Sequence, residues 1–180
     1  GLRRRVVGLA RVAADAREFR GILRNCESSN DLGLPIAFSK QARMGMYQLT
    51  CVADGPGPGL AFRAVSAVQE KERFDAVVST GFCGALDASL QTGSIVVATS
   101  VLDLEVQRQY ESCTVSTGKP YAAGLVVSQD RVADNAAEKS RLRSLTGAVA
   151  VEMEACAVAR FAGESHLPFY CVRVVSDAAT

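Results

Sequence analysis

Residues 148–177 read AVAVEMEACAVARFAGESHLPFYCVRVVSD, and this stretch decides the expected fold. Small apolar and β-branched residues predict one strand over Ala148–Met153 and a second over Pro168–Val175. Between them, Glu154–Glu164 has the apolar spacing of a helix. A strand, a helix and another strand in this order are typical of an α/β domain, in which the helix packs on the sheet.

The same alternation continues toward the N-terminus. Further strands are expected over Val6–Leu9, Pro35–Ser39, Met46–Ala53, Asp75–Thr80, Gly93–Leu102 and Gly124–Ser128. Helices are expected over Ala13–Arg24, Leu60–Glu70 and part of Arg131–Leu145, and loops over Gly81–Ala85 and residues 104–120. The sequence therefore predicts that residues 1–180 form a single α/β domain with three layers, α/β/α, and a central mixed sheet. Because such a sheet needs cover on both faces, a helix is also expected after Asp177, and these residues do not contain it.

Composition excludes several classes of protein. The 180 residues include 20 Lys and Arg against 19 Asp and Glu, a net charge of +1. The chain therefore lacks the basic excess that nucleic-acid binding requires. No apolar run reaches the roughly 18 residues of a membrane span. The six cysteines form no C-x-x-C pair and there is one histidine, so we expect no metal site, no cofactor and a reducing, cytoplasmic location.

Candidate site residues lie where strands end, because ligands of open α/β sheets bind at the carboxyl ends of strands. Glu152 and Glu154 flank Met153 at the end of an apolar strand. Acidic residues are common at helix N-termini, where they complement the helix dipole, and this interpretation needs no ligand. The functional alternative is a carboxylate that accepts hydrogen bonds from sugar hydroxyls, with Met153 packed on the ribose.

Two other segments follow strands. Ser176 and Asp177 form either a turn or helix cap or an acid at the mouth of the sheet that protonates a leaving group. In Thr80–Gly84, two glycines would let the backbone approach a ligand closely, although a simple tight turn also explains them. Cys83 lies in this segment, but without a nearby histidine it is a poor candidate nucleophile.

Four segments together resemble the nucleoside phosphorylase and nucleosidase superfamily. AVVSTGFCGA at 76–85 is similar to the family's nucleoside-binding strand and loop, and GSIVV at 93–97 is similar to the following strand. AVEMEA at 150–155 resembles the family's most specific motif, and PFYCVRVVSD at 168–177 resembles its last catalytic strand. The most similar branches in pattern are the methylthioadenosine/adenosylhomocysteine nucleosidases, the hexameric-type purine nucleoside phosphorylases and a hopanoid-associated phosphorylase branch.

The resemblance implies an enzyme that cleaves the bond between a purine-type base and ribose. Glu154 would hold the ribose hydroxyls, and Asp177 would protonate or hydrogen-bond the purine at N7. A carboxylate near the ribose would stabilise an oxocarbenium-like transition state, and an acid near the base would stabilise the leaving group. Other residues implied in substrate binding are Thr80, Phe82, Cys83, Gly84, Val132, Glu152, Met153 and Ser176.

The sequence departs from the family pattern where the nucleophile is held. Nucleosidases of the family use a Glu near the N-terminus to activate water. The resemblance places Asp15 there, with Glu18 as a fallback nearly one turn further on. Phosphorylases use an Arg and a Ser to hold phosphate, and those positions here are Ser79 and Phe82. Water is therefore favoured over phosphate as the nucleophile.

Two functional hypotheses stay open at this point. The first is an enzyme that cleaves nucleosides, either by hydrolysis or with phosphate as co-substrate. If phosphate is the co-substrate, Arg11 or Arg43 would supply the positive charge that binds it. The second is a nucleoside-binding module of the same fold that does not catalyse, since fold does not fix function. Val132, where the family has an aromatic base-stacking residue, implies a more loosely held base or a different substrate. The resemblance also implies a homo-oligomer that binds a small-molecule nucleoside.

Overall fold

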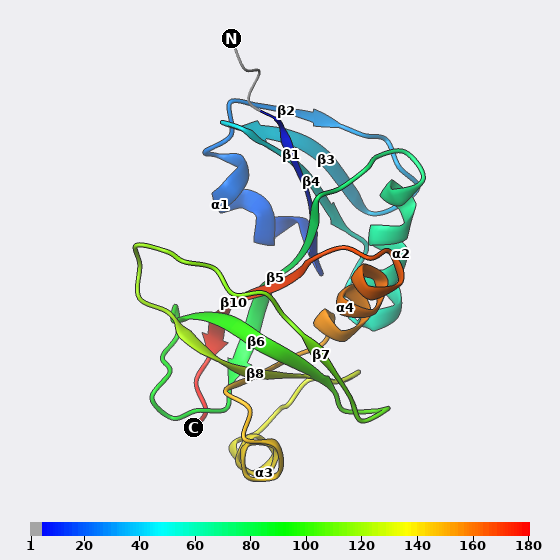
Figure 1. Cartoon of the computed structure of the whole chain (residues 1–180). Coiled ribbons are helices and arrows are strands. Elements are labelled where there is room, and N and C mark those ends of the chain that lie inside the picture. Colours follow the sequence, from blue (N-terminus) through cyan, green and yellow to red (C-terminus); the bar gives the residue numbers. More distant parts are fainter. Residues whose placement is uncertain (1–4) are drawn as a thin grey trace.

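The computed structural model describes residues 5–180, which build one large sheet with helices on both faces (Figure 1). The strands are β1 (Val7–Ala13), β2 (Ser28–Asp31), β3 (Phe38–Met44), β4 (Tyr47–Ala53), β5 (Ala76–Ala85), β6 (Ile95–Asp103), β7 (Arg108–Glu111), β8 (Ala122–Ser128), β9 (Ala150–Glu152) and β10 (Phe169–Asp177). The helices are the 3-10 helix η1 (Ala16–Phe19), α1 (Arg20–Leu23), α2 (Pro58–Gln69), α3 (Ala136–Thr146) and α4 (Ala155–Glu164).

The sheet is mixed and closes on itself at one end. Its order is β2-β3-β4-β1-β5-β9-β8-β6-β10, with β7 paired to β6. Because β10 pairs with both β6 and β5, the strands β5, β9, β8, β6 and β10 form a closed ring. The pairs β1–β5 and β5–β10 are parallel, whereas β9 runs antiparallel to β5. Residues at the ends of β5, β9 and β10 are thereby brought together on one side of the ring.

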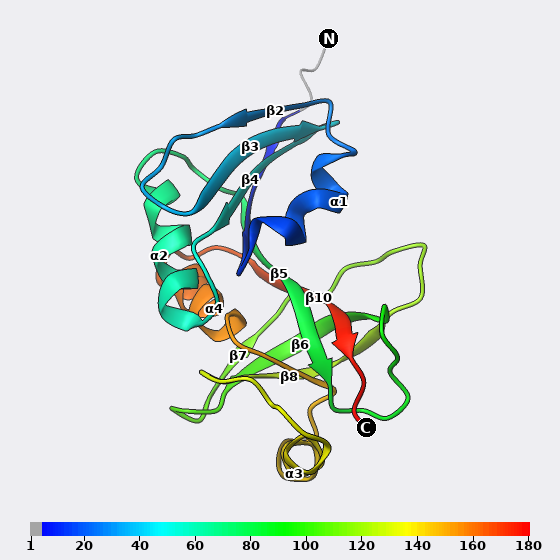
Figure 2. The same ribbon diagram turned by 180° about the vertical axis from the view of Figure 1, so that it is seen from behind.

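Helices cover the two faces of the sheet unequally. On one face, α2 and α4 pack against β1, β4, β5 and β10 around the largest apolar core (Figures 1 and 2). On the other face, η1 and α1 cover β1 and β4 through a smaller core that includes Phe19 and Leu49. The α/β class and the central mixed sheet are thus confirmed. Among residues 5–180, no helix has the length and apolar character to cross a bilayer.

The structure differs from the sequence prediction where strand pairing overrides local pattern. The helix expected over Ala13–Arg24 is reduced to the short η1 and α1, because Ala13 still pairs with Ala53 as part of β1. The expected loop over Gly81–Ala85 is the second half of β5, which pairs with β10 and β9. Residues 104–120 contain β7, and the polar edge strand β2 was not expected. These pairings are long-range, so a local sequence window does not show them.

Candidate active site

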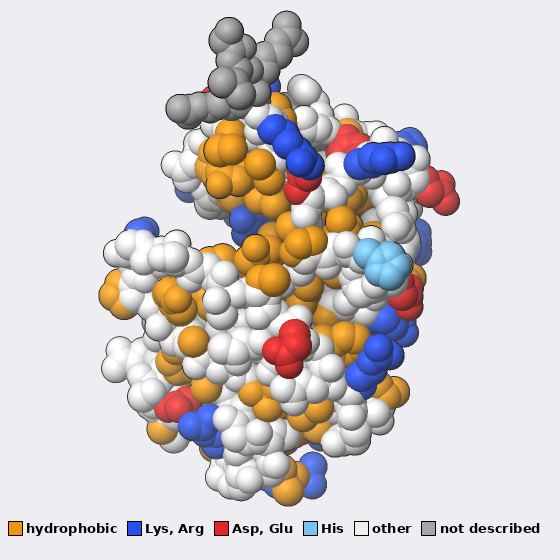
Figure 3. Space-filling view, viewed as in Figure 1, with side chains coloured by type: hydrophobic (Ala, Val, Ile, Leu, Met, Phe, Trp, Pro, Cys, Tyr) orange, Lys and Arg blue, Asp and Glu red, His pale blue; other side chains and the backbone are white. Residues whose placement is uncertain are grey.

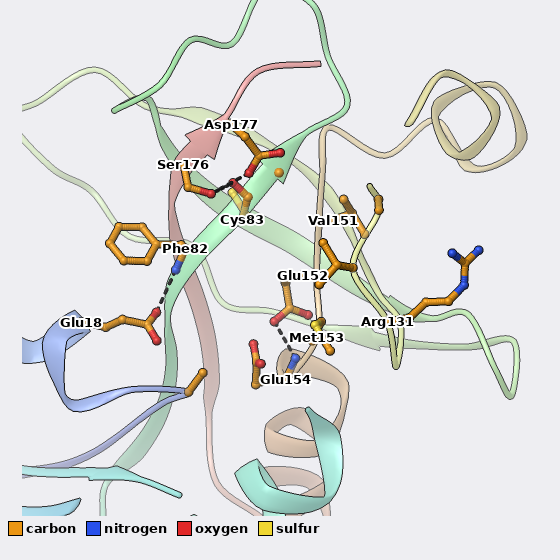
Figure 4. A pocket seen from close by; sticks show the side chains of 14 residues that line it. Glu18, Phe82, Cys83, Arg131, Val151, Glu152, Met153, Glu154, Ser176 and Asp177 are labelled. Carbon is orange, nitrogen blue, oxygen red and sulfur yellow. Dashed lines mark hydrogen bonds between the residues drawn. The ribbon is translucent and has the colours of Figure 1, made fainter. Parts of the chain in front are cut away.

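A cavity of about 200 Å³ lies at the carboxyl ends of β5 and β10, beside the turn from β9 into α4 (Figure 4). The sequence-predicted residues that line it are Phe82, Cys83, Gly84, Val132, Glu152, Met153, Glu154, Ser176 and Asp177. Two predicted residues, Asp15 and Thr80, do not line it, and Glu18 does. The fold therefore brings together carboxyl groups from three separate parts of the chain: Glu18, Asp177 and the Glu152–Glu154 turn.

Glu154 presents a buried carboxyl group at the N-terminus of α4. Its side chain is 7% exposed, and Oε1 accepts a hydrogen bond of 3.0 Å from the Gly57 N–H. Burial raises the pKa of Glu154 to about 7, and the neighbouring Glu152 charge adds to this effect. The Arg173 guanidinium lies 3.8 Å from Oε2 and opposes it. The position suits a group that meets sugar hydroxyls away from bulk water.

The raised pKa of Glu154 predicts a pH-dependent loss of stability. Because the carboxyl binds its proton more tightly in the folded chain, the free energy of unfolding should fall as pH rises from about 4.5 to about 7. Glu154→Gln, which cannot ionise, should remove this part of the dependence. Thermal melts of both proteins across this range provide the check. Parallel pH profiles of the two melting temperatures would contradict the burial argument.

Glu152 and Arg173 form a buried ion pair behind the cavity. The Arg173 side chain is 1% exposed and lies 2.6 Å from Glu152 Oε2. It also donates to Ser79 Oγ at 2.5 Å and to the Thr80 carbonyl at 2.9 Å. Glu152 accepts hydrogen bonds of 2.9 Å from the N–H groups of Glu154 and Ala155. Its carboxylate is therefore engaged within the protein, where it fixes the start of α4 and the orientation of Glu154.

Asp15 lies outside the cavity, in contrast to the position expected from the sequence. It is the N-cap of η1: its side chain accepts from the Arg17 N–H at 2.8 Å and pairs with the Arg17 guanidinium at 2.9 Å. Glu18 closes the reciprocal capping box by accepting from the Asp15 N–H at 2.9 Å. The pattern Asp-x-x-Glu is the signal that could have assigned these two roles from the sequence.

Glu18 extends from η1 across to β5, where Oε2 accepts a hydrogen bond of 2.9 Å from the Phe82 N–H. Figure 4 shows Glu18 and Glu154 approaching the same space from different elements. The two backbone donors, one to each oxygen, hold the carboxylate in a fixed orientation at the wall of the cavity.

Gly81 is required for this placement of Glu18. Its φ is +137°, and a Cβ added there would lie 1.9 Å from Glu18 Oε2 and 2.9 Å from an Arg173 nitrogen. We expect Gly81→Ala to displace the Glu18 side chain and to strain the backbone. Activity should therefore fall much more than in Gly59→Ala, where nothing lies within 4 Å of the added atom. Equal activities of the two variants in a base-release assay would contradict this role.

Asp177 is hydrogen-bonded on both carboxylate oxygens. The Ser176 hydroxyl lies 2.6 Å from Oδ1, and the Lys139 ammonium from α3 pairs with Oδ2. Burial alone would raise the pKa of Asp177, but the hydrogen bonds from Lys139 and Ser176 outweigh it and hold that pKa below its usual range. The sequence did not single out Lys139, because nothing local to α3 shows that the helix ends up beside β10.

The side of the cavity expected to hold a base is partly open. Phe82 is 55% exposed and Val132 is 60% exposed. Cys83 is buried, which raises the pKa of its thiol to about 12 and so disfavours the nucleophilic thiolate form. Thr80 does not line the cavity, and its hydroxyl accepts a hydrogen bond of 3.1 Å from Arg11.

No free cation is positioned for phosphate in the cavity wall that residues 5–180 form. Neither Arg11 nor Arg43 lines the cavity, and Arg43 is exposed and donates to the Gly45 carbonyl at 3.3 Å. Arg131 does line it, but pairs with Glu138. Elsewhere on the surface, Lys and Arg lie dispersed with Asp and Glu among them on the face shown in Figure 3.

Comparison with known proteins identifies the family. The model of the phosphorylase superfamily matches residues 12–180. The chain belongs to the phosphorylase superfamily. As a member of it, the chain is 30% identical to a 5′-methylthioadenosine/S-adenosylhomocysteine nucleosidase of Staphylococcus haemolyticus, over 81% of this chain and 76% of that protein. It is 29% identical to the protein of the same name from Haemophilus ducreyi, over 75% of this chain and 71% of that protein.

Solved structures of other proteins share the fold of this phosphorylase-superfamily chain. An S-adenosylhomocysteine nucleosidase from Streptococcus pyogenes in complex with 5-methylthiotubericidin has a TM-score of 0.86 at 21% identity, covering 99% of this chain and 86% of that one. A futalosine hydrolase mutant from Helicobacter pylori has a TM-score of 0.83 at 18% identity, covering 97% and 87%. At such identities, the likeness establishes the architecture alone.

Proposed function

We propose that the chain is a nucleosidase, which hydrolyses the N-glycosidic bond of a purine-type nucleoside and releases the free base. The observation that carries the proposal is the meeting of Glu18, Glu154 and Asp177 at one cavity, each held by a different hydrogen-bond network. The relatives named as nucleosidases support it, and three of the four segments that carry the resemblance, 76–85, 150–155 and 168–177, contribute residues to the cavity wall.

In the proposed mechanism the three carboxyl groups act on different parts of the substrate. Glu154 accepts hydrogen bonds from the ribose hydroxyls, and Met153 packs against the sugar. Glu18, oriented by two N–H groups, accepts a proton from the attacking water. The Asp177 carboxyl group, in its protonated form, donates its proton to the base at N7 as the bond to C1′ breaks. Glu154 and Glu18 also stabilise the positive charge that develops on the sugar.

Hydrolysis is favoured over phosphorolysis by charge. A phosphate in this cavity would meet the Glu18 carboxylate and find no unpaired cation among the described wall residues, since Arg131 is paired with Glu138. Arg173, behind the wall, is paired with Glu152. Placing the negative phosphate beside the negative Glu18 carboxylate costs free energy unless a cation compensates the repulsion. Water carries no charge and needs only a base to accept its proton.

The direct test is a chromatographic assay for free base. Adenosine, inosine, methylthioadenosine and adenosylhomocysteine would each be incubated with the protein, with and without phosphate. The proposal predicts base release whose rate does not depend on phosphate. Tight nucleoside binding by calorimetry with no release would support the non-catalytic binding module instead. Release only with phosphate would replace hydrolysis by phosphorolysis.

Assembly and location stay predictions from the sequence. We propose a homo-oligomer, in which a neighbouring copy covers the exposed Phe82 and Val132 side chains at the open side of the cavity. Light scattering coupled to size exclusion would test it, and a monomeric mass at assay concentration would contradict it. The cytoplasmic location is likewise proposed from the cysteine content; the six cysteines are free in the structure.

A further inference from the structure

Lys139 is a buried cation next to the cavity, and neither the proposed mechanism nor the sequence assigns it a role. Its side chain is 8% exposed. The ammonium donates to Asp177 Oδ2 and, at 2.5 Å, to the carbonyl of Ala178. Charged lysines are rarely buried unless they are paired. Burying this one against a single carboxylate therefore needs an explanation.

The surrounding backbone is shaped for this contact. A Cβ added to Gly84 would lie 3.1 Å from Asp177 Oδ2 and 3.5 Å from Lys139 Cε. The absence of a side chain at Gly84 therefore lets the carboxylate and the lysine stem approach β5 closely. Lys139 itself does not line the cavity, whereas Asp177 and Gly84 do. Any effect of Lys139 on a bound nucleoside must therefore pass through Asp177.

An ionised Asp177 cannot by itself donate a proton to a departing base. The pair with Lys139 favours the ionised carboxylate, as the lowered pKa of Asp177 indicates. A purine that leaves with the electron pair of the broken bond is a strong base and needs a proton. The only ammonium in contact with Asp177 among the described residues is that of Lys139.

We propose that Lys139 is a positioning residue for leaving-group protonation, which orients Asp177 and supplies the proton that Asp177 passes to the base. This rests on the proposed function. As the C1′–N9 bond breaks, its electron pair moves onto the purine. N7 takes a proton from the Asp177 carboxyl group, and that group takes one from Lys139 Nζ. The amine left on Lys139 recovers a proton from solvent after the base departs, while the sugar cation takes hydroxide from the water that Glu18 deprotonates.

A merely structural role for Lys139 would have different consequences. In that case the lysine would only fasten α3 to the end of β10, and its loss would affect every substrate alike. The discriminating property is the leaving group. A nucleoside base needs a proton to leave, whereas the 4-nitrophenolate of a 4-nitrophenyl riboside stabilises its own negative charge.

The experiment measures kcat and KM of Lys139→Met on the best nucleoside substrate and on 4-nitrophenyl riboside. We expect kcat for the nucleoside to fall about 100-fold or more, with KM and the rate on the nitrophenyl riboside unchanged. Arg141→Met, which removes an exposed cation from the same helix, is the matched control and should leave both rates unchanged. If Lys139→Met does not fold, Lys139→Gln makes the same comparison. Its amide can donate a hydrogen bond to Asp177 but has no proton acidic enough to transfer.

Two results would overturn the proposal: an unchanged kcat for the nucleoside, or an equal loss on both substrates. Failure of the proposed function would look different, because the unaltered protein would then release no base from any nucleoside. Rates of the parent protein on both substrates are therefore measured first.

Discussion

Replacing Glu18 with glutamine is expected to lower kcat for base release by about 100-fold or more, the usual contribution of a positioned general base. Glutamine has nearly the same shape, but its single amide oxygen can accept only one of the two N–H groups, of Phe82 or of Asp15, and it cannot take a proton from water. Binding of the nucleoside should change little. The measurement is steady-state base release with calorimetric binding of an unreactive nucleoside analogue.

Asp15→Asn is the matched control for this prediction. Asparagine is as good an N-cap as aspartate, so η1 should keep its capping box and Glu18 its position. We expect near-normal activity in this variant. If Asp15→Asn lost as much activity as Glu18→Gln, the water-activating role would have to return to Asp15.

Asp177→Asn is expected to have the second large effect, again about 100-fold or more on kcat for nucleosides. The amide keeps the size of the side chain but cannot carry a proton to N7, and it leaves Lys139 buried beside a neutral group. Cleavage of 4-nitrophenyl riboside should be far less affected. Parallel assays on the two substrates provide the measurement.

The control for Asp177→Asn is Asp134→Asn, which changes an exposed carboxylate just before α3. It should behave as the parent protein does. Full nucleoside activity in Asp177→Asn would show that the base leaves without help from this group. It would also remove the basis for a role of Lys139.

The sequence predicted correctly that the ends of certain strands lie at the cavity, because the residues at those ends stand out in the local sequence pattern. The segments around Glu154 and Asp177 are apolar strands that end in carboxylates, so their chemistry stands out in the sequence. Their shared location follows from the pairing of Gly84 with both Val151 and Asp177. Long-range pairing of this kind closes the ring of strands, and no local feature predicts it.

The position of Asp15 outside the cavity and the omission of Lys139 from the sequence prediction have separate physical causes. One of the two carboxylates, Asp15 or Glu18, had to cap η1 and the other had to reach β5. In the structure Asp15 is the N-cap, and Glu18 accepts a hydrogen bond from the Phe82 N–H of β5. Lys139 lies on a mostly polar helix, where a lysine is ordinarily exposed. Its burial arises because its ammonium reaches the end of β10, so only the tertiary structure shows its contact with Asp177.

The most direct test of the central claim, that water is the nucleophile, is phosphorus NMR of the reaction in phosphate buffer. The free base is quantified in parallel by chromatography. We expect the free base to accumulate while the inorganic phosphate signal stays constant and no sugar phosphate appears. A sugar 1-phosphate signal that grows in proportion to the free base would contradict hydrolysis and make phosphate the nucleophile.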